Sequence, residues 1–343
     1  MAKAKKLPSG NWHILVYAGK DEKGKRQYES FTAPTKREVD FLAADFALKR
    51  KERSKGNITV KEAIDRYIDS KKNILSPSTY REYLGSAERD LKDLHKIKLW
   101  DLTQELVQKA IDKEAKSHSA KTVKNMHGLL SSALSMFLPE MQLHTTLPKK
   151  QKKKLYIPTD NDIKVFLKAI EGKPIEVPVL LAATGSLRRS EISALTPEDV
   201  TDLGVNINKA MVLNSERKWV IKSPKTEAGY RFCPLPPQVV ERVRKGLPCS
   251  NPDTISHQFI SALDKCNLPH FTFHKLRHYY ASVLHALGVP DKYIMLNGGW
   301  ESDEVLKGVY QHALSDRVDK ENQKVINFFE NLYDPNHAKQ NAK

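Results

Sequence analysis

The sequence predicts a multidomain protein that is mainly α-helical and carries several small β-sheets. The chain has 343 residues. This length exceeds what a single hydrophobic core usually supports, so two or three domains are expected. Amphipathic patterns that follow helix-capping residues fill most of its length. Short alternating segments bounded by turn residues occur near the amino terminus and again after residue 200, and these segments predict strands.

Residues 1–55 predict a small sheet covered by one helix. Strand-like alternation appears in NWHILVY and RQYESFTA, which flank the turn-rich AGKDEKGK and fit a hairpin or a three-stranded sheet. The following helix begins at the capping box Thr35-x-x-Glu38. Its apolar stripe consists of Val39, Leu42 and Phe46. This region holds fourteen Lys and Arg against seven Asp and Glu, which is too basic for a purely structural unit.

Residues 56–147 predict a compact unit of four helices. The first helix starts at the capping box Thr59-x-x-Glu62. Its apolar face consists of Ile58, Ala63, Ile64, Tyr67 and Ile68. Three further helical patterns follow in SPSTYREYLGSAERDLKDL, TQELVQKAIDKEAK and SAKTVKNMHGLLSSALSMFL. Their Lys, Ser, Thr and Tyr side chains predict a polar face that is open to a partner.

A basic linker and a larger mixed unit complete the chain. The linker is predicted at residues 148–158, where two prolines bracket five lysines; a solvated tether and a tether that runs close to phosphates both fit. Residues 159–335 combine helices with three short antiparallel strands, in VNINKAMVLN, KWVIKSP and YRFCPLP. The final helix has an apolar face made of Val325, Phe328, Phe329 and Leu332. Residues 336–343 form a tail.

The net charge predicts a nucleic acid as partner. The chain has 57 Lys and Arg against 41 Asp and Glu, a formal net charge of +16, and such a surplus attracts polyanions over a Debye length. The start MAKAKKLPSG lacks the apolar core of a signal peptide, and the longest apolar run, VPVLLAAT, is too short to span a bilayer. We therefore expect a cytoplasmic protein without a membrane partner. Three widely spaced cysteines, Cys233, Cys249 and Cys266, fit a reducing compartment.

Three motif checks argue against nucleotide and metal chemistry. The segment ATGSLRRSE lacks the Gly-Lys-Ser/Thr ending of a phosphate-binding loop. Cysteine and histidine recur at four-residue spacing as Cys266, His270, His274 and His278. Pro269 and the run HFTFH argue against the continuous helix that a zinc site with this spacing needs. No clustered carboxylates indicate a divalent cation, so neither a metal nor a cofactor is expected.

A dispersed set of basic and aromatic residues remains in the second half of the chain. Its members are Arg188, Arg189, Lys225, His274, Arg277, His278, Trp300, Tyr310 and His312. Each alone has an ordinary explanation, because surface arginines, hairpin lysines and packed tryptophans are common.

The order and spacing of this set resemble the tyrosine recombinase, or phage integrase, family. The chain contains Arg-x-Ser-Glu, then Pro-Lys-Thr, His-x-Leu-Arg-His and Gly-Gly-Trp, and a tyrosine ten residues after that tryptophan. The most specific piece is FTFHKLRHYYAS, which is similar to the His-x-x-Arg box and the segment that follows it. The three units resemble the arm-binding, SAM-like core-binding and catalytic domains of lambda-type integrases, so the resemblance covers nearly the whole chain.

The resemblance implies a catalytic set by position. It consists of Arg188, Lys225, His274, Arg277, Trp300 and the nucleophile Tyr310. Arg188 stands before x-Ser-Glu, but the segment TGSLRRSE is one residue longer than usual, so Arg189 stays an alternative. Trp300 stands where most members have histidine. Lys307 and His312 occupy no catalytic position and are expected to make local contacts.

The implied chemistry needs these residue types. Attack of a phenol on a phosphodiester creates extra negative charge, which two arginines can stabilise with planar, always cationic forks. The ordinary pKa of tyrosine is about 10, so the cationic pocket must favour its deprotonation. His274 can assist as a base and Lys225 can protonate the departing 5′-oxygen. The product is a 3′-phosphotyrosyl link that conserves bond energy for rejoining.

The resemblance also implies the partners. They are double-stranded DNA at core and arm attachment sites and three further subunits in a homotetramer on DNA. A host DNA-bending protein and an excision factor are additional candidates. The apolar final helix can dock on a neighbouring subunit or pack on its own catalytic domain.

Three functions remain in contention. The leading one is a site-specific integrase of a phage or integrative element, which the basic amino-terminal region favours. A type IB topoisomerase or a chromosome-dimer resolvase shares the chemistry, and the resolvase typically lacks the arm-binding unit. A DNA-binding regulator without catalysis is the third, and an intact set of catalytic residues disfavours it.

Overall fold

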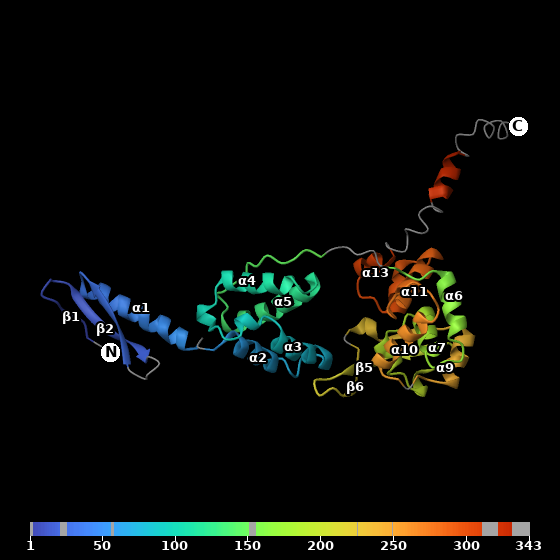
Figure 1. Cartoon of the computed structure of the whole chain (residues 1–343), viewed down its shortest axis with the longest axis horizontal. Coiled ribbons are helices and arrows are strands. Elements are labelled where there is room, and N and C mark those ends of the chain that lie inside the picture. Colours follow the sequence, from blue (N-terminus) through green and yellow to red (C-terminus); the bar gives the residue numbers. More distant parts are fainter. Residues whose placement is uncertain are drawn as a thin grey trace. The chain divides into compact units, whose positions relative to one another are not determined.

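The computed structural model is mainly helical with small sheets, as the sequence predicts (Figure 1). It divides into two compact units, Met1–Gln151 and Lys152–Lys343. The structure describes residues 3–20, 26–55, 58–150, 156–224, 226–248, 250–310 and 322–330. Among these residues no helix is long and apolar enough to cross a membrane.

The amino-terminal sheet has three antiparallel strands in the order β1-β2-β3, packed against one helix. These elements are β1 (Lys5–Lys6), β2 (Trp12–Lys20), β3 (Arg26–Ala33) and α1 (Lys36–Lys55). The predicted capping box is present, because the backbone N–H of Glu38 donates to Thr35 Oγ1 at 3.2 Å. Val39 and Ala43 are buried against the sheet, whereas Leu42 is 39% exposed. The predicted stripe was therefore wrong at Leu42, because the small Ala43 lets the helix approach the strands.

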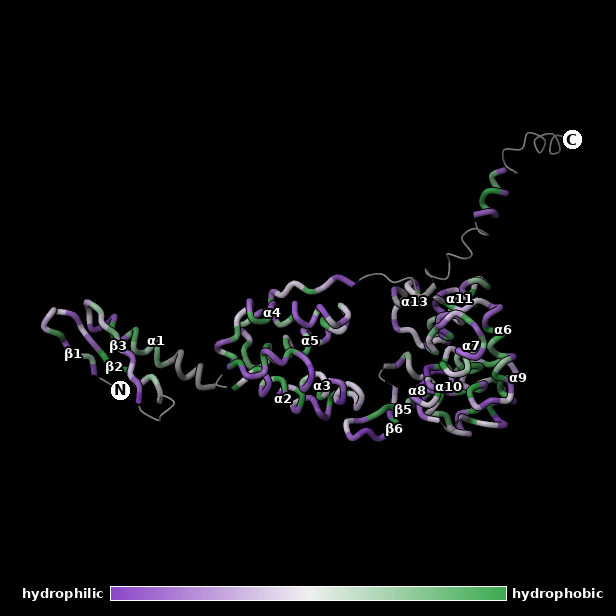
Figure 2. Tube along the Cα trace, viewed as in Figure 1, coloured by the Kyte–Doolittle hydropathy of each residue, from purple (hydrophilic) through white to green (hydrophobic). Residues whose placement is uncertain are grey.

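The next part of the first unit is a group of four helices, as predicted. They are α2 (Val60–Ser70), α3 (Pro77–Arg89), α4 (Gln104–Ala115) and α5 (Ala120–Phe137), with short 3-10 turns η1 (Lys92–Leu94) and η2 (Leu99–Asp101) between α3 and α4. Each α-helix begins at a Ser or Thr whose hydroxyl accepts a backbone N–H, namely Thr59, Ser76, Thr103 and Ser119. Hydropathy alternates along these helices (Figure 2), so one side of each builds the shared core.

An extended strap after α5 is bound to this unit. The side-chain amide of Gln108 donates to the carbonyl of Thr146 at 3.1 Å and accepts its N–H at 2.8 Å. Gln104 accepts the N–H of His144 at 3.1 Å. The two amides act as a short strand partner, so the strap is fixed before residues 151–155, which lie outside the described part of the chain. Tyr156 donates to Asp162 at the start of the second unit.

The second unit contains helices around two small sheets. In order they are α6 (Asp160–Ala169), α7 (Glu176–Gly185), α8 (Arg189–Ile192), η3 (Pro197–Asp199), β4 (Gly204–Ile207), β5 (Ala210–Leu213), β6 (Trp219–Lys222), η4 (Glu227–Gly229), β7 (Arg231–Pro234), α9 (Pro237–Lys245), α10 (Pro252–Asp264), α11 (Lys275–Ala286), α12 (Asp291–Gly298) and α13 (Asp303–Tyr310). Residues 322–330 are also helical. In this helix Val325, Phe328 and Phe329 are exposed, and Leu332 lies outside the described residues.

The prediction of three strands in this unit was wrong in number. The segment VNINKAMVLN forms two strands, and the pairs are β4 with β7 and β5 with β6, both antiparallel. The break falls at Asn208 and Lys209, whose side chains both bind Asp199, at 3.1 Å and 2.8 Å. This polar anchor turns the chain between β4 and β5.

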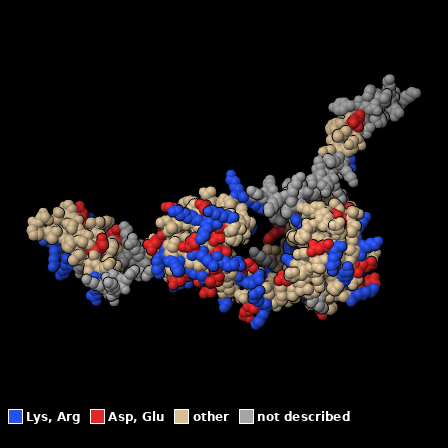
Figure 3. Space-filling view, viewed as in Figure 1, with Lys and Arg blue, Asp and Glu red and all other residues tan. Residues whose placement is uncertain are grey.

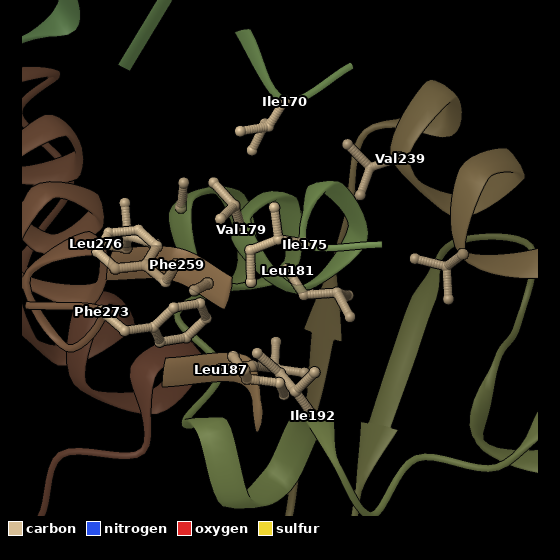
Figure 4. Packing of buried hydrophobic residues seen from close by; sticks show 14 of the residues in the cluster. Ile170, Ile175, Val179, Leu181, Leu187, Ile192, Val239, Phe259, Phe273 and Leu276 are labelled. Carbon is tan, nitrogen blue, oxygen red and sulfur yellow. The ribbon is translucent and has the colours of Figure 1, made fainter. Parts of the chain in front are cut away.

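The core of the second unit surrounds α7 (Figure 4). Val179 and Leu181 on this helix are fully buried, so the segment VPVLLAAT is a core helix. Phe259 of α10 and Phe273 meet edge to face with ring centroids 5.3 Å apart, and Leu276 of α11 is also fully buried. Close packing of this kind holds the start of α11 rigidly, and that start carries the predicted His-x-x-Arg pair.

Candidate active site

Arg277 lies at the centre of the candidate site. It is on the first turn of α11 and is 1% exposed. Its Nη2 donates to the carbonyl of Gly298 at 2.8 Å, and the guanidinium carbon lies 4.8 Å from the ring centroid of Trp300. Nε and Nη1 are buried and have no hydrogen-bond partner among the described residues. Unsatisfied donors of this kind are costly in a folded protein and often mark a functional group.

Arg188 converges on the same point, and Arg189 does not. The backbone N–H of Arg188 donates to Glu191 at 2.8 Å, and its Nη1 and Nη2 donate to Glu191 and to the carbonyl of Gly299, at 2.6 Å and 2.8 Å. Arg189 instead donates to the hydroxyl of Ser256 on α10. Of the two candidates that the sequence left open, only Arg188 therefore lies with Arg277.

Two further charged residues complete the cluster: Glu191, which sequence reasoning used only as part of the Arg-x-Ser-Glu motif, and Arg231, which it missed. Arg231 on β7 binds Glu191 with two parallel bonds, Nη2 to Oε2 at 2.8 Å and Nη1 to Oε1 at 3.2 Å. Burial alone would raise the pKa of Glu191, but the hydrogen bonds and charge of Arg231, followed by the charges of Arg188 and Arg277, lower it to about 2. Arg231 lies on the same inward face of β7 as Cys233, which is fully buried, but the residue pattern Arg-Phe-Cys-Pro alone does not indicate that the arginine faces inward.

The last turn of α12 and its C-cap, residues Asn297–Gly299, hold all three arginines. The carbonyls of Asn297, Gly298 and Gly299 accept from Arg231 Nε, Arg277 Nη2 and Arg188 Nη2 in turn, at 3.0, 2.8 and 2.8 Å. Gly299 has a φ of +63°, which favours glycine. A Cβ on Gly298 would lie 1.7 Å from the ring of Trp300. In the segment Asn-Gly-Gly-Trp, the first three residues therefore contribute backbone carbonyls that bind the arginines, and the missing side chain of Gly298 leaves room for the Trp300 ring.

His274 stands just before α11, beside the two catalytic arginine candidates. The residue is exposed, yet partial loss of water around its ring, followed by the positive charges of Arg277 and Arg188, lowers its pKa to about 4. The ring lies 5.1 Å from that of His278, which has Lys275 Nζ 3.5 Å from its Nδ1. His274 is consequently neutral at pH 7 and able to accept a proton.

Trp300 is fixed by packing. It is 8% exposed and belongs to a small apolar cluster with Tyr280, Ile294 and Leu306. Leu306 lies on α13, so this cluster joins α13 to α11. Tyr310 is the last residue of α13. Its side chain lies outside the described part of the structure.

The structure thus brings together Arg188, His274, Arg277 and Trp300 of the six predicted residues. Lys225 and His312 lie outside the described residues, and Lys307 is exposed on α13. The described residues also contain no group of three side chains that could hold a metal ion. His270 and His274 precede the start of α11 at Lys275, so the predicted break in any helix from Cys266 to His278 is present.

Lys and Arg side chains are spread over the visible surface of both units (Figure 3), and Asp and Glu side chains are interspersed among these basic residues. The candidate site itself holds three buried or half-buried arginines around one carboxylate. A single anion drawn to this cluster would meet a net positive charge in a poorly hydrated setting, where Coulomb interactions are stronger than in water.

Comparison with known proteins identifies the class. Residues 145–317 match the model of the phage integrase family, and the chain therefore belongs to this family of tyrosine recombinases. It is 21% identical over 368 aligned residues to a XerC-like tyrosine recombinase of Caldanaerobacter subterraneus subsp. tengcongensis, with 88% of this chain and 92% of that protein covered. The chain is accordingly a DNA recombinase.

Two solved structures share its fold. The integrase of transposon Tn1549, solved with transposon right-end DNA, superposes with a TM-score of 0.64 at 19% identity over 78% of this chain and 100% of that chain. The lambda integrase, solved as a dimer on a COC′ core site, gives a TM-score of 0.57 at 16% identity, covering 90% of this chain and 94% of that one. The mainly helical fold with small sheets is therefore an integrase fold.

Proposed function

We propose that this recombinase is a site-specific integrase of a phage or integrative element that acts in the cytoplasm of a bacterial host. The observation that carries the proposal is Arg277, a buried guanidinium whose Nε and Nη1 are unpaired, beside Arg188 and a neutral His274. A phosphodiester supplies what this arrangement lacks, namely anionic oxygens for the free donors.

The proposed reaction assigns each residue one task. The hydroxyl of Tyr310 attacks the phosphorus and passes its proton to His274, while Arg188 and Arg277 bind the non-bridging oxygens that gain charge. Trp300 can donate its indole N–H to the same phosphate. The bond from phosphorus to the 5′-oxygen breaks, and Lys225 protonates that oxygen. A nearby phosphate would raise the pKa of His274 again, so DNA binding itself prepares the base.

The first test uses Tyr310→Phe and a nicked suicide duplex of the protein's own core site. The wild type is expected to accumulate a covalent 3′ adduct. Cleavage frees the short strand between the cleavage point and the nick, and this strand diffuses away with the 5′-hydroxyl that rejoining needs. Tyr310→Phe should form no adduct and should bind the duplex within about threefold of the wild type, since one hydroxyl contributes only modestly to binding. The adduct is measured by denaturing electrophoresis. An undiminished adduct in the variant would remove Tyr310 from the mechanism.

Function within the class is decided by substrate. Recombination between two unlike sites supports an integrase, whereas relaxation of any supercoiled plasmid supports a type IB topoisomerase. Recombination between two copies of one site supports a chromosome-dimer resolvase. A protein that binds but forms no adduct is a regulator.

The domain roles form part of the proposal. Residues 1–55 bind arm sites, residues 56–147 bind core sites, residues 148–158 link them along the DNA, residues 159–335 catalyse and residues 336–343 form a tail. The outer face of the amino-terminal sheet supports the first role. On it Tyr17 and Tyr28 meet at 5.7 Å, and Leu15 and Tyr28 are 49% and 52% exposed.

Deletion of residues 1–55 should therefore change salt dependence selectively. The slope of log Kd against log salt for arm DNA is expected to fall by about two units or more, since each phosphate contact contributes about 0.9. Cleavage of core-site duplex should persist. The measurement is fluorescence anisotropy over a salt series. Equal loss on both DNAs would show that this unit supports the fold instead.

The proposed assembly is a homotetramer on two DNA sites, because exchange of two duplexes needs four cleavages. The lambda integrase has been solved as a tetramer bound to a Holliday junction. A host DNA-bending protein and an excision factor are proposed as additional partners of the integrase.

A further inference from the structure

Arg231 is the most completely hydrogen-bonded cation of the candidate site. Only 2% of its side chain is exposed. Both Nη atoms bind Glu191, and Nε donates to the carbonyl of Asn297 at 3.0 Å. With these bonds in place its guanidinium is not available to a DNA phosphate.

The partners of Arg231 are the groups that hold the two arginines proposed to bind the phosphate. Glu191 accepts both the backbone N–H and the Nη1 of Arg188. Gly298, the residue after Asn297, accepts from Arg277. Arg231 therefore touches the support of Arg188 on one side and the support of Arg277 on the other.

The support of Arg277 is weak without this contact. Its guanidinium has one hydrogen bond among the described residues, to the carbonyl of Gly298 in the last turn of α12, next to the C-cap Gly299. Consecutive glycines have wide backbone freedom, so an external bond at Asn297 restricts the turn where it matters.

We propose that Arg231 is a positioning residue of the recombinase active site. It locks Glu191 and the Asn297–Gly299 turn, so that Arg188 and Arg277 present their remaining donors to one phosphate. This inference rests on the proposed roles of Arg188 and Arg277. A planar fork is required, because a lysine cannot bind both carboxylate oxygens and a carbonyl in the same directions. Misplacement of donors by about 1 Å is enough to cost about a hundredfold in rate.

The test compares Arg231→Lys and Arg231→Met with the wild type. Three quantities are measured: Kd for the intact core-site duplex, the single-turnover rate of adduct formation at saturating suicide duplex, and the melting temperature. Arg231→Lys keeps a cation and is expected to fold, with Kd within threefold and a rate at least tenfold lower. Arg231→Met should lose about a hundredfold in rate.

Arg242→Met is the matched control. Arg242 on α9 also pairs with a buried glutamate, Glu176, and with Glu171. Its removal is expected to lower the melting temperature while the saturated rate stays within threefold of the wild type. A rate loss in this control equal to that of the Arg231 variants would mean that lost stability explains both, and the proposal would be overturned.

A double-variant cycle separates positioning from support of the fold. If Arg231 acts through Glu191, then Glu191→Gln and Arg231→Lys together should cost no more in rate than the worse single variant. Full additivity, or a wild-type rate in Arg231→Lys, overturns the inference. An absent wild-type adduct, or an adduct that persists in Tyr310→Phe, would instead refute the proposed function, so the two failures are distinguishable.

Discussion

Replacement of Arg277 by methionine is expected to abolish adduct formation and, at the same time, to stabilise the DNA-free protein. The rate should fall at least about a thousandfold, since loss of one transition-state donor already costs 10² to 10³. The gain in stability follows from the burial of Arg277. Its two unpaired donors remain desolvated, and burial, followed by the charge of Arg188, lowers its pKa to about 9.

The size of this gain can be estimated from the groups removed. A buried unsatisfied donor costs about 1–3 kcal/mol, and replacement of buried ionic groups by packed apolar ones is often stabilising by about 1–4 kcal/mol. Methionine is flexible enough to fill the space against Trp300. Urea unfolding without DNA should therefore show a higher free energy of unfolding, and the suicide-duplex assay measures the rate.

Arg231→Met is the control for this prediction because it makes the same substitution in a paired arginine. It leaves Glu191 buried with less compensation, which costs about 3–5 kcal/mol when a buried pair is broken. The two variants should thus move the free energy of unfolding in opposite directions. If Arg277→Met also destabilises, the cation is compensated in the free protein and is not held ready for a phosphate.

Local chemistry explains how much of the fold the sequence could predict. Thr35 and Thr59 each precede a glutamate by three residues, and both capping boxes form because the signal lies within one turn of chain. The break between β4 and β5 was missed because Asp199, which anchors it, lies nine residues before Asn208 and outside the alternating segment. Leu42 was misplaced because the width of the buried stripe depends on how closely α1 meets the sheet.

In the candidate site, too, some residues could be predicted from the sequence and others could not. Arg188, His274 and Arg277 were predicted because a family pattern gives their order. Glu191 was seen only as part of the Arg-x-Ser-Glu motif and Arg231 was missed, because their pairing joins α8 to β7, forty residues apart, and no local pattern encodes a pairing at that separation. The roles of Lys225 and Tyr310 remain predictions that rest on the sequence.

Gly298→Ala is expected to disrupt the site through Trp300. The new Cβ would lie 1.7 Å and 2.0 Å from two carbons of the Trp300 ring, and the ring is confined by Ile294 and Leu306. Overpacking of this kind typically costs about 1–3 kcal/mol, which outweighs the gain of about 1 kcal/mol for alanine over glycine in a helix. The rate of adduct formation should fall at least tenfold, because the displaced ring leaves its stack on Arg277.

Gly246→Ala is the matched control, since a Cβ there meets nothing within 4 Å, and it should leave the rate unchanged. Trp300→Ala provides the decisive background. With the indole removed, the added methyl group has space. In the Trp300→Ala background, Gly298→Ala should therefore lower the free energy of unfolding, measured by chemical denaturation, by less than about 0.5 kcal/mol, as expected for sites that no longer interact. An undiminished cost in that background would place the clash elsewhere than the Trp300 ring, and a wild-type rate in Gly298→Ala would show that the stack on Arg277 is not needed for cleavage.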